Sequence, residues 1–193
     1  MSTQNQILVF GMSHRMLFSE LDSIAKKHAL DLGHRPQAPE ELKDDYYPQF
    51  EAAVRAEAAA MSRHYEIFYC LEKSIRALVK EKLQAEKGSD WWQSAVPNNV
   101  RENASKNKQR EADSGVTARS SDMLDYTTFG ELGEIVRANW DAFSDTFNSD
   151  KAFSRVMNSL NLLRGPIAHC SPLAADEVDR LRLTLRDWFR LME

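Results

Sequence analysis

Two side chains with the chemistry to act together on a phosphate group lie near the C-terminal end of the chain. Arg164 precedes His169 by five residues in the segment LNLLRGPIAHC. A guanidinium offers a rigid fork of donors that matches a phosphate, and an imidazole can exchange a proton near neutral pH. On a straight helix, five residues turn the second side chain about 140° away from the first. Pro166 lies between them, so we expect a kink or helix end to bring them together. The pair indicates a phosphate or RNA site, and capping of a helix end is the alternative.

The apolar spacing predicts the helices that must position this pair. A helix from Ser149 or Asp150 should carry Arg164 and end or kink at Gly165 and Pro166. The other predicted helices run from Ser13 to about Leu32, from near Pro48 to about Glu86, from Thr128 to Phe143, and from Ser171 to near the end of the chain. Between them, residues 97–122 are predicted to form an exposed helix followed by a mobile loop.

Local signals fix several of these boundaries. Gly88 is a helix stop, and Thr128 with Glu131 forms a capping box. The apolar stripe of the long helix contains Met61, Tyr65, Phe68, Ile75 and Val79. We expect the tyrosines and tryptophans mainly to pack in the core, with base stacking as the alternative.

Composition bounds the class of protein. The chain has 193 residues and a net charge of −4, which argues against binding polyanions over the whole surface but leaves a local basic patch open. Ala and Leu far outnumber Val, Ile and Thr, and only 7 Gly and 6 Pro occur. These features favour an all-α fold. Two cysteines are too few for a disulfide scaffold or a Cys-rich zinc site. We expect a cytoplasmic protein that needs neither metal nor other cofactor and does not span a membrane.

A stretch with local positive charge precedes the candidate pair. Lys151, Arg155 and Arg164 occur in a segment without acidic residues. A phosphate backbone could lie along such a helix, so Lys151 and Arg155 are predicted RNA contacts.

The chain resembles the HEPN superfamily of small helical domains, in the branch also attached to a yeast RNA-quality-control endonuclease. RGPIAH is similar to the R-x4-6-H motif of that superfamily. The other matching segments occur in the order YEIFYCLEKSIRALVKEKL, then Trp91, Trp92 and Pro97, then DYTTFGELGEIVRANWDAF. The resemblance implies a HEPN-type helical bundle over residues 61–193, with residues 1–60 as an N-terminal helical extension.

The resemblance also implies a function and roles for four residues. The expected protein is a homodimeric, metal-independent endoribonuclease of toxin or antiviral-defence type, with RNA in a dimer cleft and an antitoxin or defence-system protein as a further partner. His169 would be the general base or acid, and Arg164 would stabilise the charged phosphate. Glu72 is the candidate to orient this pair, and its alternative is an ion pair with Arg76 at i,i+4. Asn161 resembles the Asn common before the motif; it is expected to bond the kinked backbone or cap the helix end.

One position departs from the pattern of active members. The residue after the motif arginine is usually polar there, often Asn or Asp, and here it is Gly165. A non-catalytic HEPN module that binds RNA or a protein partner therefore stays open. So does a helical dimerisation domain without nucleic acid, in which Arg164 would pair with a carboxylate inside the bundle.

Overall fold

The computed structural model describes residues 17, 18, 20–28 and 47–193. The chain divides into two compact units, residues 1–50 and 51–193. In the first unit, the described residues between 17 and 28 are helical, and a short 3-10 helix, η1, spans Tyr47–Gln49. The remainder of the helix predicted from Ser13 to Leu32 lies outside the described residues.

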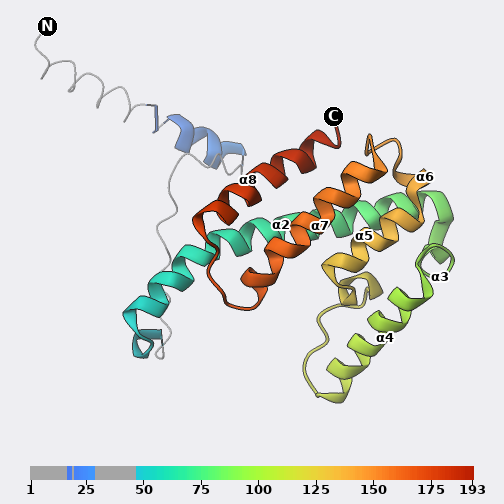
Figure 1. Cartoon of the computed structure of the whole chain (residues 1–193), viewed down its shortest axis with the longest axis horizontal. Helices are drawn as coiled ribbons and strands as arrows, with labels where there is room; N and C mark the ends of the chain where they lie inside the picture. The colour runs from blue at the N-terminus through green and yellow to red at the C-terminus, as the bar shows by residue number, and fades with distance from the viewer. Residues whose placement is uncertain (1–16, 19, 29–46) are drawn as a thin grey trace, which may run out of the picture. The chain divides into compact units, whose positions relative to one another are not determined.

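The second unit is a bundle of α-helices (Figure 1). No strand occurs among the described residues, and the predicted all-α class is confirmed. The helices are α2 (Ala52–Lys87), α3 (Trp91–Ala95), α4 (Asn98–Asp113), α5 (Phe129–Ala138), α6 (Trp140–Phe143), α7 (Asp150–Ala168) and α8 (Ala175–Arg190), with 3-10 turns η2 (Gly88–Asp90) and η3 (Met123–Tyr126). The predicted domain boundary between residues 60 and 61 falls inside α2 and remains a prediction.

The long helix α2 runs through the bundle and contacts both α5 and α7, while α7 also packs against α5 and α8 (Figure 1). Phe68, Ile75, Val79 and Leu83 recur along one face of α2 and are almost fully buried. Their partners in the core include Phe129, Leu132, Phe153 and Leu160. Tyr65, expected in the same stripe, is instead 61% exposed. It lies one turn before Phe68, where the buried face of α2 begins.

Two signals in the sequence set the ends of helices as predicted. Gly88 ends α2 with a φ of 69°, in the left-handed region that glycine adopts at little cost. The Thr128 side chain accepts from the backbone N–H of Glu131, and the Glu131 carboxylate accepts from the N–H of Thr128. This capping box starts α5 and fixes the chain direction just after Thr127.

Other boundaries differ from the predictions. The single helix expected from Thr128 to Phe143 is broken at Asn139, whose side-chain amide donates to the carbonyls of Ile135 and Ala95. The helix expected at Ser171 begins only at Ala175, because Leu173 packs against the core while residues 171–174 cross between helices without helical structure. The predicted exposed helix, α4, buries Val100 and Ala104 completely. Within the described ranges, no helix combines the length and apolarity needed to cross a membrane.

Candidate functional site

The carboxylate of Glu72 lies between two arginines. Arg76 Nη2 donates to Glu72 Oε1 at 2.5 Å, and Arg164 Nε lies 3.4 Å from Glu72 Oε2. Glu72 and Arg76 are four residues apart on α2 and so share a face, whereas Arg164 comes from the last turns of α7. The two contacts predicted as alternatives for Glu72 are therefore both present, one on each carboxylate oxygen.

Arg76 is the buried member of this cluster, at 9% exposure. Its Nη1 donates to the hydroxyl of Thr127 at 2.8 Å and to the carbonyl of Leu124, and its Nη2 donates to the carbonyl of Thr127 at 2.8 Å. A buried cation is costly unless it is paired and hydrogen-bonded. These three oxygens and Glu72 meet that need, and they tie α2 to the segment that precedes α5.

Arg164 is more open than Arg76. Its side chain is 39% exposed, and within the described residues its two terminal nitrogens make no hydrogen bond. Arg164 lines a cavity of about 210 Å³, which we call the Arg164 cavity. It is lined by Tyr65, Phe68, Tyr69, Glu72, Lys73, Arg76, Arg164, Ile167 and Ala168. Three cations and one carboxylate give this lining a net charge of +2, which suits an anion.

His169 is the C-cap of α7 and is exposed. We expected the helix to end or kink at Gly165 and Pro166; it does not end there but continues to Ala168, with Pro166 inside it. Pro166 lies in the last turn, so its missing N–H removes only the bond to the carbonyl of Leu162. The helix end is closed when Cys170 adopts a φ of 56° and Ser171 N–H donates to the Pro166 carbonyl at 2.9 Å.

His169 and Arg164 make no hydrogen bond to each other in the described part of the chain. His169 is not among the residues that line the Arg164 cavity, and its imidazole makes no hydrogen bond to any residue in the described part of the chain. The backbone N–H of His169 donates to Gly165 and Pro166 carbonyls, as expected at a helix end.

The remaining predicted site residues lie elsewhere on α7. Asn161 is exposed, borders Gly130 of α5, and makes no side-chain hydrogen bond within the described ranges. It neither caps the helix nor lines the Arg164 cavity. Lys151 and Arg155 are exposed and one turn apart. Arg155 and Arg164 are nine residues apart, which places them about half a turn from each other around the helix.

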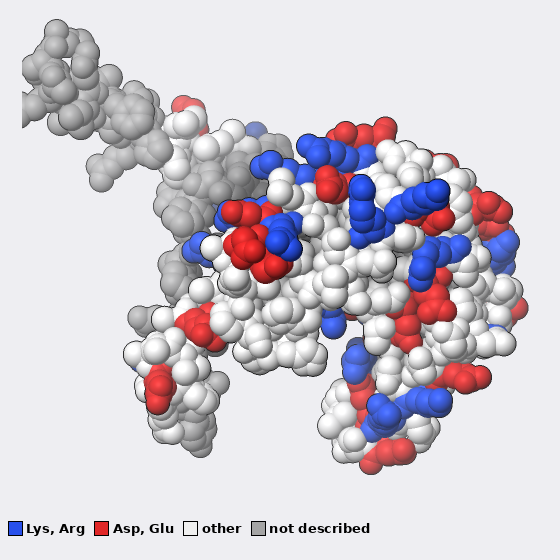
Figure 2. All heavy atoms as spheres, in the orientation of Figure 1, with Lys and Arg blue, Asp and Glu red and all other residues white. Residues whose placement is uncertain are grey.

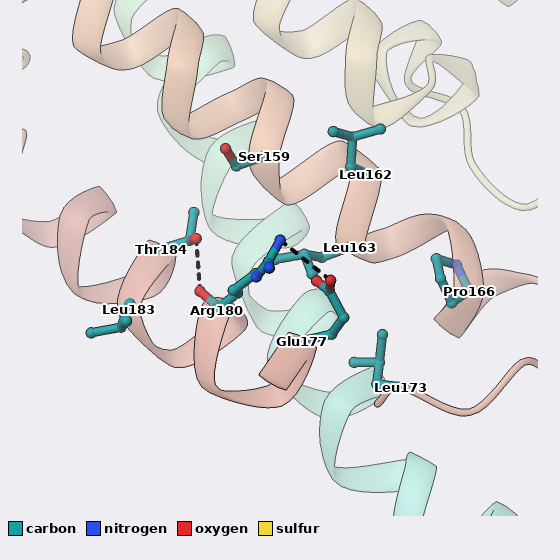
Figure 3. Close-up of a pocket in the computed structure, with 9 residues that line it drawn as sticks. All are labelled: Ser159, Leu162, Leu163, Pro166, Leu173, Glu177, Arg180, Leu183 and Thr184. Carbon is teal, nitrogen blue, oxygen red and sulfur yellow. Dashed lines mark hydrogen bonds and ion pairs between the residues drawn. The ribbon is translucent and has the colours of Figure 1, made fainter. Parts of the chain in front are cut away.

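A larger cavity, of about 590 Å³, lies between α7 and α8 (Figure 3). It is lined by Ser159, Leu162, Leu163, Pro166, Leu173, Glu177, Arg180, Leu183 and Thr184. Arg180 turns towards Glu177, with Nη1 and Oε1 3.4 Å apart. Leu162 is 78% exposed and Leu183 is 57% exposed. We call this apolar area the α7–α8 face.

An all-α bundle with an Arg-x4-His segment at the end of a long helix defines the chain as a HEPN domain. Residues 66–193 match the family model described as Swt1-like HEPN, and the chain belongs to that family. No curated protein and no solved structure matches the chain. Family membership indicates an RNase-type or RNA-related function, and the matched region includes Glu72, Asn161, Arg164 and His169.

Proposed function

We propose that this protein is a metal-independent endoribonuclease that acts as a homodimer through Arg164 and His169. The observation that carries the proposal is the state of Arg164. Glu72 Oε2 lies 3.4 Å from Nε of the Arg164 guanidinium, while the Arg164 side chain lines a cavity with net positive charge. A guanidinium oriented in this way is prepared to receive a phosphate without reorganising.

The proposed reaction needs no group beyond RNA and these side chains. The ribose 2′-hydroxyl attacks the adjacent phosphorus, the bond from phosphorus to the 5′-oxygen breaks, and a 2′,3′-cyclic phosphate and a 5′-hydroxyl are left. One imidazole takes the proton of the 2′-hydroxyl or gives a proton to the departing 5′-oxygen, and the imidazole of the second protomer makes the other of these two proton transfers. Arg164 stabilises the extra negative charge on the five-coordinate phosphorus. Glu72 keeps Arg164 in place.

The dimer is part of the proposal because the cavity that Arg164 lines has no contribution from His169 of the same chain. His169 lies outside the Arg164 cavity, so a second copy supplies the nearest route to a site that holds both groups. The exposed Leu162 and Leu183 of the α7–α8 face support such an association, since large exposed apolar areas mark interaction surfaces. We propose a toxin or antiviral-defence setting, in which an antitoxin or another defence protein controls the enzyme.

RNA contacts outside the cleft are proposed for Lys151 and Arg155. On the face shown in Figure 2, acidic and basic side chains are interspersed. No broad positive field is visible there, so RNA binding must depend on local groups of cations. The two residues are exposed one turn apart on α7, where they can contact successive phosphates away from Arg164.

A second candidate function is favoured by two observations. Gly165 replaces the polar residue expected after the motif arginine, and His169 does not line the Arg164 cavity. Both suit a HEPN module that binds RNA or a protein without cutting. The contact of Arg164 with Glu72 is also what a helical dimerisation domain without nucleic acid would show.

The ends of RNA fragments test the proposal. Wild type, His169→Ala, Arg164→Ala and the exposed-site control His28→Ala are purified identically and incubated with mixed RNA in EDTA. Cyclic-phosphate ends from wild type and His28→Ala, but not from the two motif variants, are the expected result. Intact RNA with salt-dependent binding would instead establish the non-catalytic RNA-binding module, provided that circular dichroism shows a folded protein. If the wild-type protein neither cleaves nor binds RNA, an RNA function is rejected.

A further inference from the structure

Two tyrosines that we expected to be buried are on the surface beside Arg164. Tyr65 is 61% exposed and Tyr69 is 56% exposed. They are four residues apart on α2, with ring centroids separated by 6.2 Å and ring planes at 38°. Both line the Arg164 cavity. Buried aromatic side chains stabilise the core, but these two rings leave more than half of their surface to solvent, so core packing does not explain them.

The cavity is apolar and aromatic at one end and cationic at the other. Its floor includes Phe68, which is 4% exposed and packs edge-on against Phe129. Ile167 and Ala168 contribute from α7. Lys73 follows Tyr69 by one helical turn and is exposed, so it continues the row of the two tyrosines along α2 towards the arginines. Stacking surfaces and cations are thus aligned within one site.

We propose that the Arg164 cavity is a single-nucleotide subsite for single-stranded RNA, in which Tyr65 and Tyr69 stack a base while Lys73 and Arg164 hold the adjoining phosphate. The inference rests on the proposed RNA function and adds which form of RNA is bound and by which groups. Aromatic rings bind unpaired bases because every base has a stacking face. Bases within a duplex are already stacked, so the site selects unpaired RNA.

Size and charge favour a nucleotide over the other occupants. A cavity of about 210 Å³ is below the range of about 300–1,000 Å³ typical of pockets for whole drug-sized ligands, so it accommodates part of a chain that continues outside. Exposed tyrosines also occur where protein partners bind. Here, however, they share a cavity of net charge +2 with an arginine whose terminal nitrogens have no hydrogen bond within the described residues. That combination complements a base linked to a phosphate.

The test measures binding of a short fluorescein-labelled 2′-O-methyl oligoadenylate, which lacks the attacking hydroxyl and so cannot be cut by wild type. Tyr65→Ala and Tyr69→Ala should each weaken binding about 5- to 150-fold. The slope of log affinity against log salt should not change, because no phosphate contact is lost. Lys73→Gln should reduce that slope by about 0.7. Tyr65→Phe and Tyr69→Phe, which keep the ring, should bind as wild type does.

A second measurement changes the RNA by removing its bases. An abasic oligomer of the same length should bind wild type more weakly by a similar factor and should bind Tyr65→Ala and wild type equally. Alanine variants that are folded and bind the oligoadenylate as wild type does would overturn the stacking subsite while leaving the RNA function intact. A change in sedimentation of the alanine variants, with RNA binding unchanged, would assign the tyrosines to a protein interface and also overturn it. Failure of wild type both to bind and to cleave would reject the RNA function itself.

Discussion

Arg76 donates hydrogen bonds to both the hydroxyl and the backbone carbonyl of Thr127, each at 2.8 Å. The two residues are separated by 51 positions in the sequence. Because Arg76 also binds Glu72, which contacts Arg164, the start of α5 is connected to the candidate site through one buried guanidinium. Arg76 is therefore a positioning residue, whereas the side chain of Arg164 is 39% exposed and lines the Arg164 cavity.

The two arginines should differ sharply in their effect on stability. Arg76→Met leaves the buried carbonyl of Thr127 without its donor, while the Leu124 carbonyl still accepts from the N–H and hydroxyl of Thr127. It also removes the partner of Glu72 on α2, so we expect the free energy of unfolding to fall by about 3 kcal/mol. Arg164→Met removes a half-exposed contact while Glu72 keeps Arg76, and it should cost less than about 1 kcal/mol. Urea unfolding of both variants measures the difference. Equal losses of unfolding free energy in the two variants would show that the buried hydrogen bonds of Arg76 do not stabilise the fold more than the contact of Arg164.

The loop before η3 should give stability that depends on pH. Burial alone would raise the pKa of Asp122, but bonds from Lys80 Nζ at 2.6 Å and Leu124 N–H at 3.0 Å hold it below its ordinary value. A carboxyl with a lowered pKa in the folded state stabilises above its unfolded pKa of about 3.9 and loses this contribution as pH falls through its folded value. Asp122→Asn should thus be less stable than wild type at pH 7.

The difference in unfolding free energy between Asp122→Asn and wild type should shrink as pH falls below about 3.9. Chemical unfolding at pH 7 and at several lower pH values measures this. Asp145, whose pKa is also lowered, chiefly by Lys82, is more exposed and gives a comparison variant with a smaller expected effect. A difference for Asp122→Asn that stays constant with pH would contradict the ion pair with Lys80.

Cys170 should be replaceable by glycine with a gain in stability. Its φ of 56° is unfavourable for a residue with a Cβ atom, and the conformation is required for Ser171 N–H to reach the Pro166 carbonyl. Relief of this strain, partly offset by the greater freedom of unfolded glycine, gives an expected gain of about 0.5–1 kcal/mol. Thermal unfolding of Cys170→Gly checks it. Cys170→Ala keeps the Cβ and should show no gain.

The proposed dimer should depend on the α7–α8 face. Leu162→Asp places a charge where two copies would each bury a leucine worth about 1.5–3 kcal/mol, so the dimer should weaken by at least about 100-fold. Val116→Asp is the control, since Val116 is 57% exposed and lies outside the lining of the α7–α8 cavity. Sedimentation over a range of concentrations distinguishes them. Equal dimerisation of both variants would place the interface elsewhere.

Local signals allowed much of the fold to be predicted. Gly88, the Thr128–Glu131 capping box and the Ser149 cap act within a few residues of themselves, and each sets a helix end in the structure. Contacts from distant segments could not be read in the same way. Asn139 ends α5 partly through the carbonyl of Ala95, 44 residues earlier, and Leu173 delays α8 by packing on the core.

The same distinction applies to the site. The i,i+4 pair of Glu72 with Arg76 follows from spacing on one helix, and the contact of Glu72 with Arg164 was suggested by family resemblance. The sequence did not indicate which oxygens bind Arg76. It showed only that an arginine lies on the buried side of α2, three residues before Val79. Tyr65 was expected in the core because helical spacing places it on the apolar face of α2. The spacing does not show along what length of a long helix other helices pack against that face.

Arg76 precedes Leu124 and Thr127, whose oxygens it binds, by about 50 residues in the sequence. The contacts of the site therefore form in a fixed order during synthesis. Once Lys87 has been added, α2 is complete, and Glu72 and Arg76 can already pair on it. A nascent chain that has emerged only through α4 still lacks Leu124 and Thr127, so its arginine stays hydrated. Arg164 arrives later again. The cavity, with its cations in place, thus requires the chain to have been made through Ala168, and RNA in contact with shorter nascent chains on the ribosome does not meet it.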